Sequence, residues 1–107
     1  MNIVITGAAD GLGREIANEL KDNNLILIDI DENRLVDVSK KLKAKHYLCD
    51  LANATDIKTV CKDIISKNKT IDILINCAGI WLDEKNEEDI KKYQNMILVN
   101  LFAPIAI

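Results

Sequence analysis

The sequence predicts an α/β fold, a doubly wound open parallel sheet of four strands with helices on both faces. Two observations support this prediction. Short aliphatic runs alternate with amphipathic helical patterns along all 107 residues, and the connections between them are only a few residues long. Strand–helix–strand units of this kind form right-handed crossovers to a parallel neighbour. With 49% hydrophobic and 29% charged residues, the composition is that of one globular domain, residues 1–107.

The four predicted strands are short runs rich in aliphatic residues. Residues 2–6 and 25–30 carry almost unbroken apolar runs, as expected of strands buried on both faces. Residues 46–50 and 71–76 supply the other two strands. Each strand is followed by a helical pattern, which is the order expected of a parallel sheet.

Apolar residues recur at helical spacing after each strand. The first stripe consists of Leu12, Ile16, Ala17 and Leu20. Residues 32–43 and 55–67 repeat the pattern, and Ile65 belongs to the apolar stripe of the second of these helices. A fourth helix is expected to begin near Glu87 or Glu88, because acidic residues suit a helix N-terminus.

Composition excludes several classes of function. The net charge of −3 and the absence of a basic cluster argue against a nucleic-acid-binding protein. The longest apolar run, residues 97–107, is interrupted and too short to span a membrane, and the N-terminus does not resemble a signal peptide. Cys49, Cys61 and Cys77 lack metal-type spacing, so we expect free thiols, no metal site and a cytoplasmic location.

The strongest local motif is the glycine-rich segment of residues 6–13, at the junction of the first strand and first helix. Glycines at positions 7, 11 and 13 allow a tight turn, close approach of a ligand to the backbone, and close packing of helix on strand. The N–H groups and dipole of the helix N-terminus favour a pyrophosphate there. Arg14 follows Gly13 where a P-loop has Lys. A glycine-rich turn without a ligand is the alternative interpretation.

Asp29 ends the second predicted strand, at about the distance from the glycine-rich turn expected of an acid that binds an adenosine ribose. A carboxylate there accepts hydrogen bonds from the ribose hydroxyls and repels a 2′-phosphate. Ile30 follows where a basic residue would neutralise that phosphate, and Arg34 is expected inside the next helix. The sequence therefore favours NAD(H) over NADP(H). Alternatively, Asp29 and Asp31 only cap that helix.

Four motifs together resemble the short-chain dehydrogenase/reductases, along the whole chain. They are the turn at residues 6–13, Asp50-Leu51, Asn76-Cys77-Ala78-Gly79 and Val99-Asn100-Leu101. The resemblance implies a Rossmann-type sheet of strand order 3-2-1-4, incomplete relative to the family, in which Asp50 and Leu51 contact adenine. The expected cofactor-binding residues are Gly7, Ala9, Asp10, Gly11, Leu12, Gly13, Asp29, Ile30, Asp50, Leu51, Asn76, Ala78 and Gly79.

The resemblance also implies that Asn100 belongs to a catalytic tetrad whose other members are a Ser and a Tyr-x-x-x-Lys pair. Neither Tyr47 nor Tyr93 is followed by Lys four residues later. Without a general acid, the chain is expected to be an N-terminal, NAD(H)-binding part that does not transfer hydride alone. The alternatives are an enzyme piece completed by a second chain or by downstream sequence, and a cofactor-free structural or interaction module.

Two positions depart from the family pattern. Asp10 places an acid near the expected pyrophosphate, where it would repel the ligand or cap the first helix. Cys77 replaces a second Asn and lacks its amide. Because the fourth strand would be internal in a complete family fold, we expect self-association through this strand or the fourth helix.

Overall fold

Four parallel strands form a single sheet in the computed structural model, which describes residues 1–78. The strands are β1 (Asn2–Thr6), β2 (Asn24–Asp29), β3 (Lys45–Leu48) and β4 (Ile73–Asn76). Their order is β3-β2-β1-β4, and each neighbouring pair is parallel. The predicted α/β class and the strand order 3-2-1-4 are confirmed.

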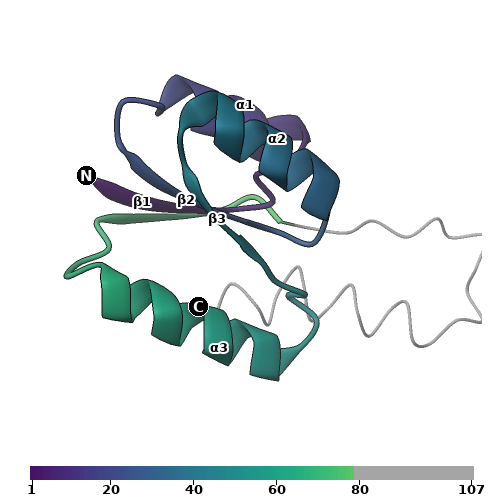
Figure 1. Ribbon diagram of the computed structural model, residues 1–107, viewed down its shortest axis with the longest axis vertical. Helices are drawn as coiled ribbons and strands as arrows, with labels where there is room; N and C mark the ends of the chain where they lie inside the picture. Colours follow the sequence, from purple (N-terminus) through teal and green to yellow (C-terminus); the bar gives the residue numbers. More distant parts are fainter. Residues whose placement is uncertain (79–107) are drawn as a thin grey trace, which may run out of the picture.

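Three helices within residues 1–78 cover both faces of the sheet. They are α1 (Gly11–Glu19), α2 (Glu32–Leu42) and α3 (Ala54–Lys67). Helices α1 and α2 lie on one face and α3 on the other, which is the predicted doubly wound arrangement (Figure 1). The helix predicted from Glu87 or Glu88, together with Gly79 and Asn100, lies outside the described residues.

Strands β1 and β2 are buried on both faces. Their side chains facing α1 and α2 are Ile3, Ile5, Leu25 and Leu27. Those facing α3 are Val4, Ile26 and Ile28. None of these side chains is more than 3% exposed, and full burial of one such side chain contributes about 1.5–3 kcal/mol relative to exposure. The buried central strands therefore fix the positions at which the loops at their carboxyl ends begin.

Side-chain caps mark the start of each helix. Asp10, Asp31 and Asn53 precede α1, α2 and α3, and each accepts hydrogen bonds from the first turn of its helix. Helix α2 ends at Leu42, one residue earlier than predicted, because Lys43 adopts a left-handed conformation with φ of 53°.

Three strands differ slightly from their predicted bounds. Strand β2 ends at Asp29 instead of residue 30, because the Asp29 carboxylate accepts the N–H groups of Ile30 and Asp31 and turns the chain. Strand β3 ends at Leu48, opposite Asp29, where its partner strand ends. Strand β4 begins at Ile73, because the carboxylate of the preceding Asp72 accepts the Asn2 N–H.

Two predicted core residues are exposed. Leu12 is 71% exposed, because it lies in the first turn of α1, beyond the carboxyl edge of the sheet. Ile65 is 68% exposed, since the buried stripe of α3 runs through Ile57, Val60 and Ile64 and leaves Ile65 about a quarter-turn away. Among residues 1–78, no helix is both long and apolar enough to cross a membrane.

Candidate functional site

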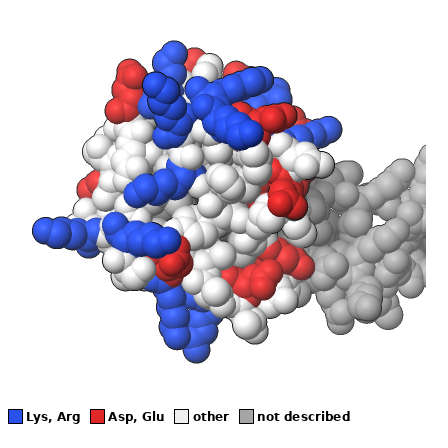
Figure 2. Space-filling model, viewed as in Figure 1, with Lys and Arg blue, Asp and Glu red and all other residues white. Residues whose placement is uncertain are grey.

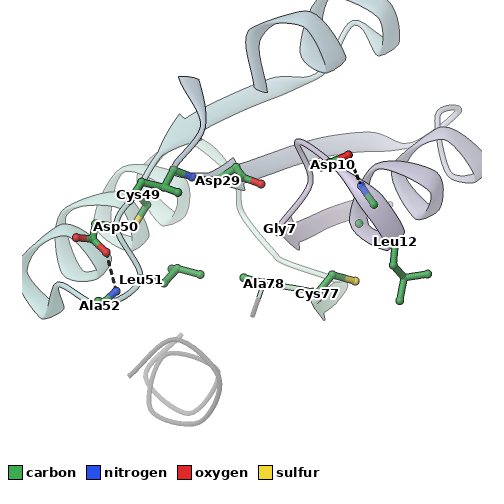
Figure 3. A pocket seen from close by; sticks show the side chains of 13 residues that line it. Gly7, Asp10, Leu12, Asp29, Cys49, Asp50, Leu51, Ala52, Cys77 and Ala78 are labelled. Atoms are coloured by element: carbon green, nitrogen blue, oxygen red, sulfur yellow. Dashed lines mark hydrogen bonds between the residues drawn. The ribbon is translucent and has the colours of Figure 1, made fainter. Parts of the chain in front are cut away.

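A cleft of about 570 Å³ opens at the carboxyl end of the sheet (Figure 3). It is lined by Gly7, Asp10, Gly11, Leu12, Gly13, Asp29, Ile30, Cys49, Asp50, Leu51, Ala52, Cys77 and Ala78. These residues come from the segments that follow all four strands. Because the chain passes from β1 to β2 and β3 on one side and returns to β4 on the other, the cleft lies at a topological switch point, where open α/β sheets bind their ligands.

The structure brings together most of the residues predicted to bind a cofactor. Ala9 is buried beneath the turn and does not line the cleft. Asn76, at the end of β4, is likewise absent from the lining, and Gly79 lies outside the described residues. Sequence reasoning missed Ala52 as a cleft residue and treated Cys49 as a packing residue only. Their positions just after the third strand were the available signal for both.

The three glycines of the turn have different roles. Gly7 has φ of 68°, and a Cβ there would lie 2.6 Å from the Ala78 backbone N. A Cβ on Gly13 would lie 2.1 Å from the Gly7 carbonyl oxygen. Gly11 has φ of 56°, but its Cβ would meet no atom within 4 Å. Gly7 and Gly13 therefore permit close backbone packing, whereas Gly11 leaves open space at the start of α1.

Helix α1 presents its N-terminus to this open space. The Asp10 carboxylate accepts the Gly11 N–H at 2.8 Å and serves as the N-cap. The next N–H groups, of Leu12 and Gly13, have no acceptor inside the helix, as at every α-helix N-terminus. The capping interpretation of Asp10 is confirmed, and the helix start keeps donors that suit an anion.

Asp29 joins the glycine-rich turn to the end of β2. One of its carboxylate oxygens accepts the Ala9 N–H at 2.9 Å, and the other accepts the N–H groups of Ile30 and Asp31 at 2.7 and 3.1 Å. A carboxylate has about four acceptor positions, so the hydrogen bonds within residues 1–78 leave one position on Asp29 for a further donor. Asp31 caps α2 and Asp29 does not, which removes capping as the explanation for Asp29.

The loops after β3 and β4 complete the cleft. The Asp50 carboxylate accepts the Ala52 N–H at 2.9 Å, and Leu51 is 7% exposed. Thr6, which is 1% exposed, accepts the Ala78 N–H on its hydroxyl at 3.2 Å. This bond holds the end of β4 against the glycine-rich turn. The role of Thr6 was not predicted, although Thr6 opens the motif.

Carboxylate side chains and the buried thiol of Cys49 contribute to the lining of this cleft. Figure 2 shows carboxylates near the carboxyl ends of the strands and many Lys and Arg side chains at the opposite end. Burial, followed by the nearby Asp56 carboxylate, raises the pKa of Cys49 to about 11, so its thiol stays protonated near neutral pH. In the part of the chain that the structure describes, no group of His, Cys, Asp and Glu side chains could hold a metal ion.

A second raised pKa belongs to Tyr47, in β3, on the same face of the sheet as Cys49. The Tyr47 hydroxyl donates a hydrogen bond to the Asp63 carboxylate. Burial and this bond raise the pKa of Tyr47 to about 12. The bond from Tyr47 and the one from Lys67 lower the pKa of Asp63. This pair connects β3 to α3 and does not line the cleft.

The sequence matches a family described as short chain dehydrogenase over residues 1–107. An uncharacterized oxidoreductase of Staphylococcus saprophyticus is 32% identical over 107 residues, covering 92% of this chain and 46% of the relative. Short-chain dehydrogenase reductase 3c of Arabidopsis thaliana is 27% identical over 106 residues, covering 92% of this chain and 41% of the relative. The chain thus spans less than half the length of these relatives.

Solved structures share the fold. A metagenomic short-chain oxidoreductase in complex with NADP has a TM-score of 0.92 and 25% identity, with 99% of this chain and 52% of that chain covered. A short-chain dehydrogenase/reductase from Brucella melitensis has a TM-score of 0.85 and 26% identity, with coverages of 98% and 47%. A short-chain dehydrogenase from Sphingobium yanoikuyae in complex with NADPH, at 24% identity and a TM-score of 0.86, shows the fold alone.

Proposed function

This chain belongs to the short-chain dehydrogenase family, and we propose that it forms the NAD(H)-binding portion of an oxidoreductase of that family. One observation carries the proposal: the Asp29 carboxylate stands beside the glycine-rich turn, in a cleft at the switch point of the sheet. This is the arrangement that binds dinucleotides in such folds. A cleft of about 570 Å³ is within the range of cofactor sites.

The described residues fit such a ligand at both ends of its adenosine diphosphate. Asp29 retains one acceptor position for a ribose hydroxyl, and the open space at Gly11 leaves room for a pyrophosphate at the start of α1. Asp50 and Leu51 would border the adenine, while Ala78, which follows β4, would face the nicotinamide end of the cofactor. Bound NAD would supply a hydride acceptor, and the residues of this chain would hold and orient it.

The preference for NAD(H) over NADP(H) rests on Asp29. Three of the solved neighbours are complexes with NADP or NADPH. In this chain, however, a carboxylate stands at the end of β2, and a 2′-phosphate placed there would meet like charge. The proposed preference is therefore a property of this chain's own residues.

Hydride transfer would need groups beyond those of this sequence. The 107 residues contain no Tyr-x-x-x-Lys segment, and Asn100 alone cannot donate a proton to a substrate carbonyl. Since the chain spans 41–46% of the two curated relatives described above, completion by a second chain or by downstream sequence is the second candidate. A reading frame encoding a Ser and Tyr-x-x-x-Lys after residue 107 would support it.

Titration of the chain with NADH, followed by the fluorescence of the nucleotide, tests the proposal. We expect saturable binding that Asp29→Asn weakens about tenfold or more, because a charged hydrogen-bond acceptor is lost. Asp22→Asn removes an exposed carboxylate from the turn between α1 and β2 and serves as the matched control. Absence of binding at millimolar NADH would reject the proposal in favour of a cofactor-free module.

We also propose that the chain self-associates through β4 and that it is located in the cytoplasm. Within residues 1–78, β4 is an edge strand, and its Ile73 and Leu74 are each 37% exposed. An aliphatic strand at a sheet edge favours pairing with another chain. The three cysteines of the chain are free, which suits a reducing compartment. Light scattering at tens of micromolar tests association, and a clean monomer would contradict it.

A further inference from the structure

The only two arginines of the sequence, Arg14 and Arg34, both lie against Asp10. A guanidinium nitrogen of Arg34 is 2.7 Å from one Asp10 carboxylate oxygen, and a guanidinium nitrogen of Arg14 is 3.9 Å from the other. Arg34 also lies 3.5 Å from the Asp31 carboxylate. The side chains are half to two-thirds exposed, so this cluster does not stabilise a buried core.

Asp10 belongs to two hollows at once. It lines the cleft described above and a second hollow of about 530 Å³ between α1 and α2, which contains both arginines. Ala9, its neighbour in sequence, donates its N–H to Asp29. Asp10 therefore stands between the cleft that contains Asp29 and the hollow that contains both guanidinium groups.

Guanidinium groups are the preferred partners of phosphate in proteins, because their N–H forks match its oxygens. Two of them beside a ribose would attract a phosphate attached to that ribose. In this structure the Asp10 carboxylate binds Arg34 and forms a longer ion pair, of 3.9 Å, with Arg14. We propose that Asp10 is a specificity-determining residue that keeps Arg14 and Arg34 from binding the 2′-phosphate of NADP(H). This inference rests on the proposed function, and it adds a second determinant to Asp29.

Asp10→Asn removes the charge of Asp10 and keeps a side chain that can cap α1. Asn is as good an N-cap as Asp, so α1 keeps its cap while Arg14 and Arg34 both lose the charge of Asp10. Arg34 then keeps only the more distant Asp31 carboxylate, at 3.5 Å. We expect the ratio of NADPH affinity to NADH affinity to rise about fivefold or more, the effect of one added ion pair in water. Because the attraction is between exposed groups, raising the salt concentration should reduce this gain.

Dissociation constants of NADH and NADPH, measured by titration calorimetry for four forms of the chain, test the inference. The forms are the unaltered protein, Asp10→Asn, Asp10→Asn with Arg34→Gln, and Asp37→Asn. Asp37 lines the same second hollow and is the matched control. The affinity ratio should rise in the first variant, fall back toward the original value in the double variant, and stay unchanged in the control. Circular dichroism checks that each form is folded.

The outcomes separate the two proposals. If the unaltered chain binds NADH but Asp10→Asn leaves the ratio unchanged, the role of Asp10 is refuted and the proposed function stands. A gain that persists in the double variant also refutes it, because Arg34 would then not be responsible. If the unaltered chain binds neither nucleotide, both the proposed function and this inference are refuted.

Discussion

The packing of Gly13 against Gly7 leads to a prediction about the stability of the site. In Gly13→Ala the new Cβ would lie 2.1 Å from the Gly7 carbonyl oxygen, 2.7 Å from the Gly7 carbonyl carbon and 3.2 Å from the Ala8 Cα. All three are backbone atoms, so no side chain can rotate away. The glycine-rich turn and the first turn of α1 would have to separate by roughly 1.5 Å to restore an ordinary contact.

Two opposing effects determine how much Gly13→Ala changes the free energy of unfolding. Alanine is favoured over glycine inside a helix by about 1 kcal/mol, whereas overpacking costs about 1–3 kcal/mol or more when backbone must shift. The clash dominates, and we expect Gly13→Ala to lower the free energy of unfolding by about 2 kcal/mol. In the matched variant Gly11→Ala the Cβ meets open space. That variant should lose only about 1 kcal/mol, the cost of a left-handed conformation.

Urea unfolding followed by circular dichroism measures both variants against the unaltered chain. The expected order of stability is unaltered chain, Gly11→Ala, Gly13→Ala. If Gly13→Ala were as stable as the unaltered chain, or more stable than Gly11→Ala, the proposed contact between the helix and the turn would be refuted. An unchanged m-value would show that the variants alter stability and not the extent of unfolding.

Three further predictions concern the rest of the fold. Thr6→Val should destabilise the chain by about 1 kcal/mol in urea unfolding, because the Ala78 N–H loses its hydroxyl acceptor; an unaffected variant would contradict this. Asn53→Ala removes the acceptor for two N–H groups in the first turn of α3, and its unfolding midpoint should fall by an amount equivalent to about 1 kcal/mol. The lowered pKa of Asp63 contributes stability above pH 3.8, its unfolded value, and this contribution is lost as the pH falls through the folded pKa. The raised pKa of Tyr47 contributes stability that is lost between pH 10 and about 12. Tyr47→Phe should therefore flatten both limbs of the stability–pH curve, and parallel curves for the two proteins would show that the pair is not coupled to folding.

The sequence predicted the sheet well because its strands are buried on both faces. Ile3 to Ile5 and Leu25 to Ile28 lie in the centre of the sheet. Their short unbroken apolar runs are typical of strands buried on both faces. The errors concern residues at element ends. Leu12 and Ile65 follow the helical period, but whether a helix position is covered depends on how far the helix extends past the sheet and on which side the sheet lies.

The sequence predicted the site residues whose type is required by the backbone geometry or by the expected ligand. Gly7, Gly13 and Asp29 occupy the positions that their spacing indicated. The ion pair between Asp10 and Arg34 could not be predicted, because it joins a turn to a helix that follows a different strand. The same is true of the bond from Ala78 to Thr6. Such contacts depend on the register of the strands, which the local sequence does not encode.

That bond between Ala78 and Thr6 joins residues 72 positions apart in the chain. Strands β1, β2 and β3 lie side by side in the order in which they occur in the chain. Strand β4 instead follows β3 in the chain and must cross to the other side of the sheet before it pairs with β1. Longer loops are entropically costlier to close and slower to form. A folding intermediate in which β4 is not docked would lack the part of the cleft formed by Cys77 and Ala78. Nucleotide affinity should therefore report whether the last strand has docked.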